Sequence, residues 1–75
     1  MFKQKTFCER LRSLRSSQDL TLEQLANELN LVKQTIGNWE NGIRTPSLEA
    51  SIALAEYFNV SLDYLVGLSD RPQRH

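Results

Sequence analysis

Cysteine and histidine are almost missing from this chain, which contains one of each, Cys8 and His75. One thiol cannot form a disulfide within the chain, and it has no partners for a metal-ligand set. The sequence also has no glycine-rich phosphate loop and no cluster of histidine, cysteine and carboxylate residues. We therefore predict that the protein is not an enzyme and that it uses neither a metal nor a cofactor.

Long hydrophobic runs are missing as well. Nowhere do about 18 apolar residues follow one another, which argues against a membrane-spanning helix. The first residues, MFKQKTF, lack the apolar run of a signal peptide. A single free thiol suits a reducing compartment. We predict a cytoplasmic protein with no membrane partner.

A net charge of either sign is also absent, because nine basic residues balance nine acidic ones. The charges are nevertheless segregated along the chain. Residues 1–44 contain seven basic and five acidic side chains, whereas residues 45–70 contain no basic and four acidic ones. This distribution mildly favours phosphate as a partner of the first half of the chain.

With 75 residues, the chain is long enough for one domain at most. Apolar residues at helical spacing predict that this domain is all-α, with five short helices in one compact unit. The residues expected to face inward are Phe7, Leu11, Leu14, Leu22, Leu25, Ala26, Leu29, Ile36, Trp39, Leu48, Ile52, Ala55 and Phe58. We predict a flexible N-terminus over 1–5, the folded domain over 6–68 and a disordered tail over 69–75.

Hydroxyl residues mark the predicted helix starts, since their side chains can accept hydrogen bonds from the free amides of a first helical turn. The expected caps are Thr6 with Glu9, Thr21 with Gln24, Ser47 and Ser61. Gly67 is expected to end the fifth helix.

The segment 20–42, LTLEQLANELNLVKQTIGNWENG, predicts two short amphipathic helices joined by a tight turn. Asn30 stands where the chain must reverse, and asparagine tolerates a left-handed conformation. The next helix is expected from about Lys33 to Glu40. Its polar side chains are expected on the face of the helix that does not pack against the core. Such a pair, over about 21–41, is how a small domain presents a helix to the major groove of DNA.

Four ordered motifs give the chain a family resemblance: LTLEQLA, TIGNWENG, RTPSLE and VSLDYLVG. Together they resemble the Cro/lambda-repressor-like helix-turn-helix family of phage and bacterial transcription regulators, over about Leu11 to Leu65. The resemblance implies an all-α domain that binds double-stranded DNA through its third helix. It also implies a homodimer on paired half-sites, for which we expect the segment from Tyr57 to Leu68 to be the contact region.

The resemblance places base-reading side chains at Lys33, Gln34 and Asn38. The positions expected near the DNA backbone are Thr21, Thr35, Asn41 and Arg44. The chemistry agrees, because a glutamine can bind adenine through two hydrogen bonds and a lysine can donate to guanine. On the residues alone, the base-reading trio could also be a solvated helix face.

Two further residues have a structural interpretation. In the family the positions of Arg15 and Glu40 form an internal ion pair that ties the first helix to the third. Trp39 could be imagined stacking on a base, but its spacing from Ile36 favours the core.

Four residues depart from the family pattern on the expected DNA side: Leu22, Val32, Gly37 and Ile43. Leu22 stands where the family typically has a glutamine, and Val32 stands where it has a serine or threonine that caps the helix. Gly37 replaces a residue whose side chain usually reads a base, and Ile43 replaces a basic residue. These changes exchange polar contacts for apolar surface. They support an alternative function, in which the helix-turn-helix grips another regulator as an antirepressor or corepressor through Leu22, Val32 and Ile43.

Overall fold

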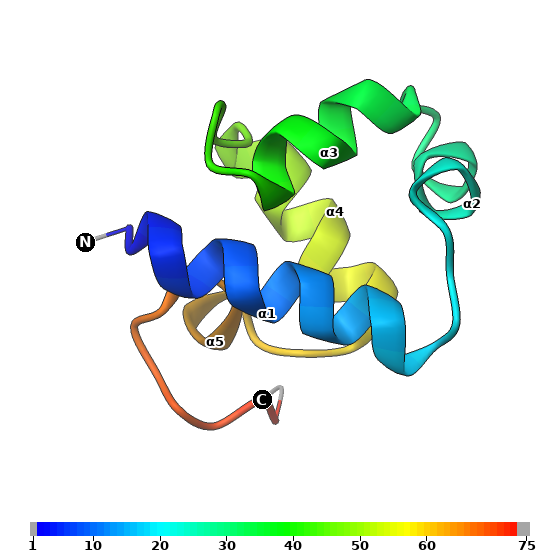
Figure 1. Cartoon of the computed structure of the whole chain (residues 1–75). Helices are drawn as coiled ribbons and strands as arrows, with labels where there is room; N and C mark the ends of the chain where they lie inside the picture. The colour runs from blue at the N-terminus through cyan, green and yellow to red at the C-terminus, as the bar shows by residue number, and fades with distance from the viewer. Residues whose placement is uncertain (1, 74–75) are drawn as a thin grey trace.

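The structure, a computed structural model, describes residues 2–73, which form five helices (Figure 1). They are α1 (Gln4–Ser17), α2 (Leu22–Glu28), α3 (Lys33–Glu40), α4 (Leu48–Phe58) and α5 (Leu62–Val66). Within these residues there is no strand, so the all-α prediction is confirmed. In the same range, no helix combines the length and the apolar character that crossing a bilayer requires.

One hydrophobic core is shared by the five helices. α1 contacts both α3 and α5, while α2 packs against α3 and α4 packs against α5. In Figure 1, α3 lies above α1 and α5 lies below it. The largest side chains that are fully buried are Phe7, Leu11, Leu25, Ile36, Leu54 and Leu65. Every helix contributes at least one of them. The core therefore holds α3 in place through the inner side of that helix, which contributes Ile36.

Local capping defines three of the helix starts. The Thr21 hydroxyl accepts from the Gln24 amide at 3.0 Å, and the Gln24 side chain accepts from the Thr21 amide at 2.8 Å. The hydroxyls of Ser47 and Ser61 accept from first-turn amides in the same way. Gly67, with φ of 91°, ends α5. All these helix ends were predicted from the sequence and are confirmed.

The start of α1 differs from the prediction. Its N-cap is Lys3, and Thr6 lies inside the helix, so the predicted capping box at Thr6 is wrong. The Lys3 amide donates instead to the carbonyl of Val66 at the end of α5, at 3.0 Å. The start of α1 is therefore held by a hydrogen bond to the end of α5 and not by a local side-chain cap.

The inner face of α4 also differs in part. Ala55 and Phe58 are buried as predicted, but Leu48 is 70% exposed and Ile52 is 40% exposed. The buried stripe begins at Ser51 instead, whose hydroxyl donates to the Ser47 carbonyl at 2.9 Å. A serine satisfied in this way can be buried, which allows the helix to turn its other side outward.

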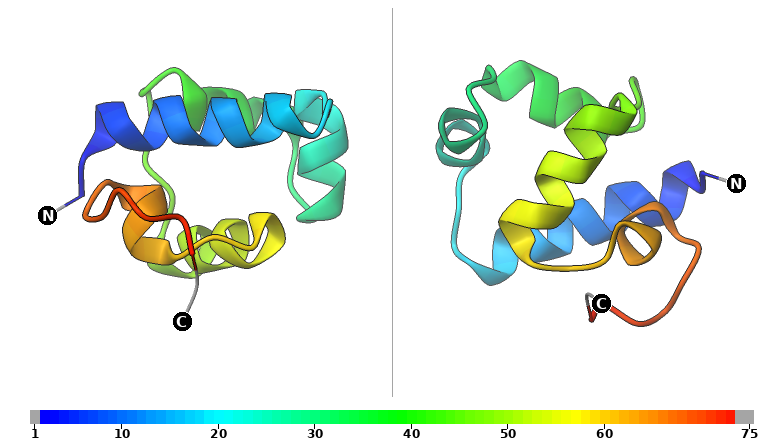
Figure 2. Two further views of the ribbon diagram at one scale, coloured as in Figure 1. Left: turned by 90° about the horizontal axis from the view of Figure 1, so that it is seen from below. Right: turned by 180° about the vertical axis from the view of Figure 1, so that it is seen from behind.

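Residues 69–73, within the predicted disordered tail, lie against the folded domain (Figure 2). One guanidinium nitrogen of Arg10 donates to the carbonyls of Tyr64 and Ser69, and its distance to the Ser69 carbonyl is 2.7 Å. The Ser61 amide donates to the Pro72 carbonyl at 2.9 Å. The segment therefore packs along α1 and α5. Residues 74 and 75 of the predicted tail, and residue 1 of the predicted flexible N-terminus, lie outside the described residues.

Candidate nucleic-acid interface

The two sides of α3 have opposite characters. On the inner side, Ile36 is 0% exposed and Trp39 is 6% exposed. On the outer side, Lys33 and Gln34 are exposed and Asn38 is partly exposed. A helix advances by about 100° per residue, so Gln34 and Asn38 share a direction away from the core. The three predicted base-reading positions therefore lie outside, and Trp39 belongs to the core as predicted.

The turn between α2 and α3 sets the direction of α3. Asn30 adopts a left-handed φ of 58°, as predicted for the point of reversal. The Leu31 amide then donates to the carbonyl of Ala26 at 2.8 Å, which gives a carbonyl of the last turn of α2 a hydrogen-bond partner. Figure 1 shows the result, with α2 seen nearly along its axis and α3 running across the view.

The loop after α3 folds back onto the helix. Gly42 has a φ of 75°, which glycine adopts without strain. The amides of Ile43 and Arg44 both donate to the carbonyl of Asn38, at 2.9 and 3.3 Å. From α1, the Gln4 side chain donates to the Gly42 carbonyl at 2.8 Å. Arg44 is thereby held beside the outer side of α3.

A shallow hollow of about 410 Å³ lies along this outer side. It is lined by Val32, Gln34, Thr35, Asn38, Trp39, Arg44 and Thr45. The hollow thus gathers four predicted DNA contacts from the helix and from the loop that follows it. The other three, Thr21, Lys33 and Asn41, do not line it, and all three are exposed. The Thr21 hydroxyl is engaged in capping α2.

Arg15 and Glu40 form an ion pair that joins α1 to α3. Glu40 is 5% exposed, and its two carboxylate oxygens accept from Arg15 at 2.6 and 3.1 Å. The hydrogen bond to Glu40 raises the pKa of Arg15 above its ordinary value, against the opposing effect of burial. Since arginine is charged throughout the accessible pH range, this shift gives no pH dependence near neutrality.

Arg12 is a second contact of α1 with the end of α3, and the sequence prediction did not include it. It donates to the Glu40 carbonyl at 3.0 Å and to the Asn41 side-chain oxygen at 3.4 Å. Arg12 stands one helical turn before Arg15, and this spacing is the signal that could have identified it. The last turn of α3 is therefore held by two arginines of one helix.

The three apolar residues of the alternative interface, Leu22, Val32 and Ile43, do not form a single exposed surface. Leu22 is partly buried against the core. Val32 and Ile43 are 66% and 67% exposed, but they stand at opposite ends of α3, a helix of eight residues and therefore about 12 Å long. The polar residues of the hollow lie between them.

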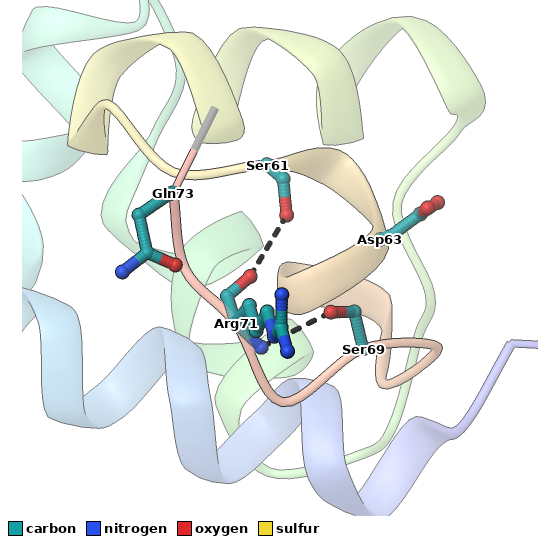
Figure 3. Close-up of a pocket in the computed structure, with 5 residues that line it drawn as sticks. All are labelled: Ser61, Asp63, Ser69, Arg71 and Gln73. Atoms are coloured by element: carbon teal, nitrogen blue, oxygen red, sulfur yellow. Dashed lines mark hydrogen bonds between the residues drawn. The ribbon is translucent and has the colours of Figure 1, made fainter. Parts of the chain in front are cut away.

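A second hollow, of about 430 Å³, lies between α5 and the C-terminal segment and is lined by Ser61, Asp63, Ser69, Arg71 and Gln73 (Figure 3). Its hydrogen bonds are internal: the Ser61 hydroxyl bonds the Arg71 carbonyl, and the Ser69 hydroxyl accepts from the Arg71 amide. Within residues 2–73, no group of three or more histidine, cysteine and carboxylate side chains is placed to hold a metal.

Two helices set at an angle by a tight turn, with the second one polar on its outer side, define the helix-turn-helix class of domain. The helix-turn-helix family matches this chain over residues 11–65. The chain therefore belongs to the Cro/lambda-repressor-like, XRE-type helix-turn-helix family, as its motifs predicted. The family consists of DNA-binding transcription regulators that are not enzymes, in agreement with the prediction made from the sequence.

Several relatives are similar over most of the chain. It is 41% identical over 66 residues to the uncharacterized HTH-type transcriptional regulator YobD of Bacillus subtilis (strain 168), covering 88% of this chain and 59% of YobD. It is 34% identical over 64 residues to the cryptic phage CTXphi transcriptional repressor RstR of Vibrio cholerae, covering 85% of this chain and 58% of RstR. The chain thus spans less than two thirds of the length of these relatives.

The fold has a counterpart among solved structures. The solution structure of the SOS-response transcriptional repressor LexA from Eubacterium rectale superposes with a TM-score of 0.78 and 33% sequence identity. The match covers 84% of this chain and 68% of the other.

Proposed function

We propose that this domain binds a specific sequence of double-stranded DNA by inserting α3 into the major groove, and that it represses transcription by doing so. The observation that carries the proposal is the hollow along α3, which gathers Gln34, Thr35, Asn38 and Arg44 on one exposed surface. The major groove is wide enough to admit such a helix. Occupying DNA is sufficient to exclude other proteins, and the relative RstR is by name a repressor. DNA as the partner implies action in the cytoplasm.

The side chains divide into two roles. Gln34 is suited to bind adenine through two hydrogen bonds, Lys33 to donate to guanine, and Asn38 to read a neighbouring base pair. Arg44 supplies a positive charge for a phosphate. The remaining backbone contacts are assigned to Thr21, Thr35 and Asn41. Phosphate contacts would fix the register of α3, and the base contacts would select the sequence.

We infer that the domain binds as a homodimer on two half-sites about one helical turn apart. Support comes from an apolar groove of about 480 Å³ whose lining includes Leu62, Val66 and Leu68, from the segment expected to form the contact. Leu48 and Phe2 line the same groove, as do Thr45 and Pro46 from the loop after α3. A second copy seated there would lie next to the DNA-facing side of the first.

The dimer is tested by Leu68→Glu, with Ile52→Glu as the matched control. Both residues are exposed, at 53% and 40%, but only Leu68 lines the groove. Leu68→Glu is expected to yield a monomer in sedimentation equilibrium and to lose tight binding to paired half-sites. Equal behaviour of the two variants would exclude this groove as the interface.

Selection from random duplexes, at about 50 mM and about 200 mM salt, tests DNA binding itself. We expect enrichment of one sequence, with affinity falling steeply at the higher salt because bound cations are released from phosphates. Arg44→Ala should weaken all duplexes alike and reduce the salt slope by about one. Failure to enrich any sequence at low salt would overturn the proposal.

The alternative, a module that grips another regulator, is favoured by the exposure of Val32 and Ile43. It predicts little salt dependence and a large loss of partner binding when Val32 is changed to aspartate. The separation of Val32 from Ile43 by the polar hollow, and the partial burial of Leu22, make DNA binding the better supported function.

A further inference from the structure

The outer side of α3 carries no side chain at Gly37. With about 100° per residue, Gly37 lies one turn beyond Lys33 and points between the directions of Lys33 and Gln34. It therefore belongs to the side of the helix that carries the predicted base contacts. The backbone of Gly37 is partly exposed there, among side chains that reach outward.

The fold does not require a glycine at this position. The glycines with positive φ among the described residues are Gly42 and Gly67, so Gly37 has ordinary helical backbone. A Cβ added to Gly37 would meet one described atom within 4 Å, Leu22 Cδ1, at 3.8 Å, which is ordinary van der Waals contact. Glycine also weakens a helix interior relative to alanine. The glycine at position 37 is therefore better explained by a ligand that comes close to the outer side of α3.

Leu22 gives the empty position a particular chemistry. It is the first residue of α2 and is partly exposed, with its inner part against the core. Its Cδ1 methyl thus lies beside the partly exposed backbone of Gly37 and gives that position an apolar neighbour. We call this space the Gly37 notch. A methyl-sized group fits there, since Leu22 Cδ1, at 3.8 Å, is the neighbour that a Cβ added to Gly37 would meet.

We propose that the Gly37 notch receives the C5-methyl group of a thymine, so that Leu22 and Gly37 select a thymine in each half-site. This inference rests on the proposed insertion of α3 into the major groove. The thymine methyl is the apolar group that the major groove presents. Contact with Leu22 would remove it from water, and the missing side chain at Gly37 would allow the base edge to come close. The notch thereby adds an apolar contact beside the bases read by Lys33 and Gln34.

Deoxyuridine tests the proposal, since it differs from thymidine only in lacking this methyl group. In the duplex obtained by selection, each thymine is replaced in turn and affinity is measured by fluorescence anisotropy. We expect one thymine in each half-site whose replacement weakens binding about fourfold, the effect of exposing one buried methyl. Replacement of thymines elsewhere in the half-site should have little effect.

Gly37→Ala supplies the matching protein change, because its methyl group occupies the notch. The variant is expected to bind the thymine and deoxyuridine duplexes equally, and more weakly than the wild type binds thymine. Its melting temperature should rise by about 4–8 °C, as helix propensity predicts. Ser13→Ala, at an exposed position of α1, is the control for added helix stability and should keep the preference for thymine.

The outcomes separate this inference from the proposed function. If no duplex is enriched, both fail together. If an operator is found but no deoxyuridine replacement weakens binding, or the half-site contains no thymine, the notch has no such role and DNA binding stands. An undiminished thymine preference in Gly37→Ala would also overturn the inference.

Discussion

α2 and α3 are neighbours in one motif, yet they are held in place by different means. α2 begins with the reciprocal capping box of Thr21 and Gln24. The N-cap of α3 is Val32, whose side chain has no acceptor for a first-turn amide, and the last residue of α3, Glu40, forms an ion pair with Arg15. α2 is therefore stabilised locally, whereas the helix proposed to face DNA depends on its contacts with α1 and the core. The side chains on the outer side of α3 are therefore not needed to hold the helix in place.

Breaking the contact between α1 and α3 should have the largest effect. Arg15→Met leaves the buried carboxylate of Glu40 without its main partner, and we expect a loss of about 3 kcal/mol or more in the free energy of unfolding. The measurement is urea denaturation followed by circular dichroism. Arg12→Met is the control, because Arg12 is 53% exposed and should cost less than about 1 kcal/mol.

The double variant Arg15→Met/Glu40→Leu sharpens this result. Removing both charges should recover much of the loss, since an apolar pair of similar volume can replace a buried ion pair. A loss in Arg15→Met no larger than that in Arg12→Met would contradict the importance assigned to the pair.

Gln34→Ala tests the outer side of α3. Because Gln34 is exposed, we expect the stability to change by less than about 0.5 kcal/mol. The discrimination at one base pair of the selected duplex should nevertheless fall by about 1–3 kcal/mol. Competition binding against duplexes varied at each position measures this. A uniform loss over all sequences would instead assign Gln34 to the phosphate backbone.

The smallest expected effect concerns the two helix starts. Val32→Ser introduces the missing cap at a residue that already has the extended backbone of an N-cap, with φ of −99° and ψ of 152°, and should stabilise the domain by about 1 kcal/mol. Thr21→Val removes the cap of α2 and should cost a similar amount. Thermal unfolding of both variants checks the pair. If the two changes have the same sign, the difference drawn between the helices is wrong.

Local signals explain which parts of the fold could be predicted. The bounds of α3, the reversal at Asn30 and the caps at Thr21, Ser47 and Ser61 all follow from residues within a few positions of one another, and all were predicted. The start of α1 could not be, because it depends on the contact of Lys3 with Val66 across the fold.

Ambiguous patterns explain the remaining differences. Two helical stripes can be drawn along α4, and only packing decides that Ser51 is buried while Leu48 and Ile52 are exposed. For the candidate interface, the outward direction of Lys33, Gln34 and Asn38 could be predicted from the spacing of Ile36 and Trp39. The position of Arg44 beside Asn38 could not, since it requires the loop to fold back through backbone hydrogen bonds.

Trp39 is the single tryptophan of the chain, and it is 6% exposed while also lining the hollow along α3. Its indole is thus an intrinsic fluorophore located beneath the surface proposed to meet DNA. Loss of the fold will move its emission to longer wavelengths as water reaches the ring. Ligand docking in the hollow will change its intensity without any attached dye, so one optical signal can follow both events in the unmodified protein.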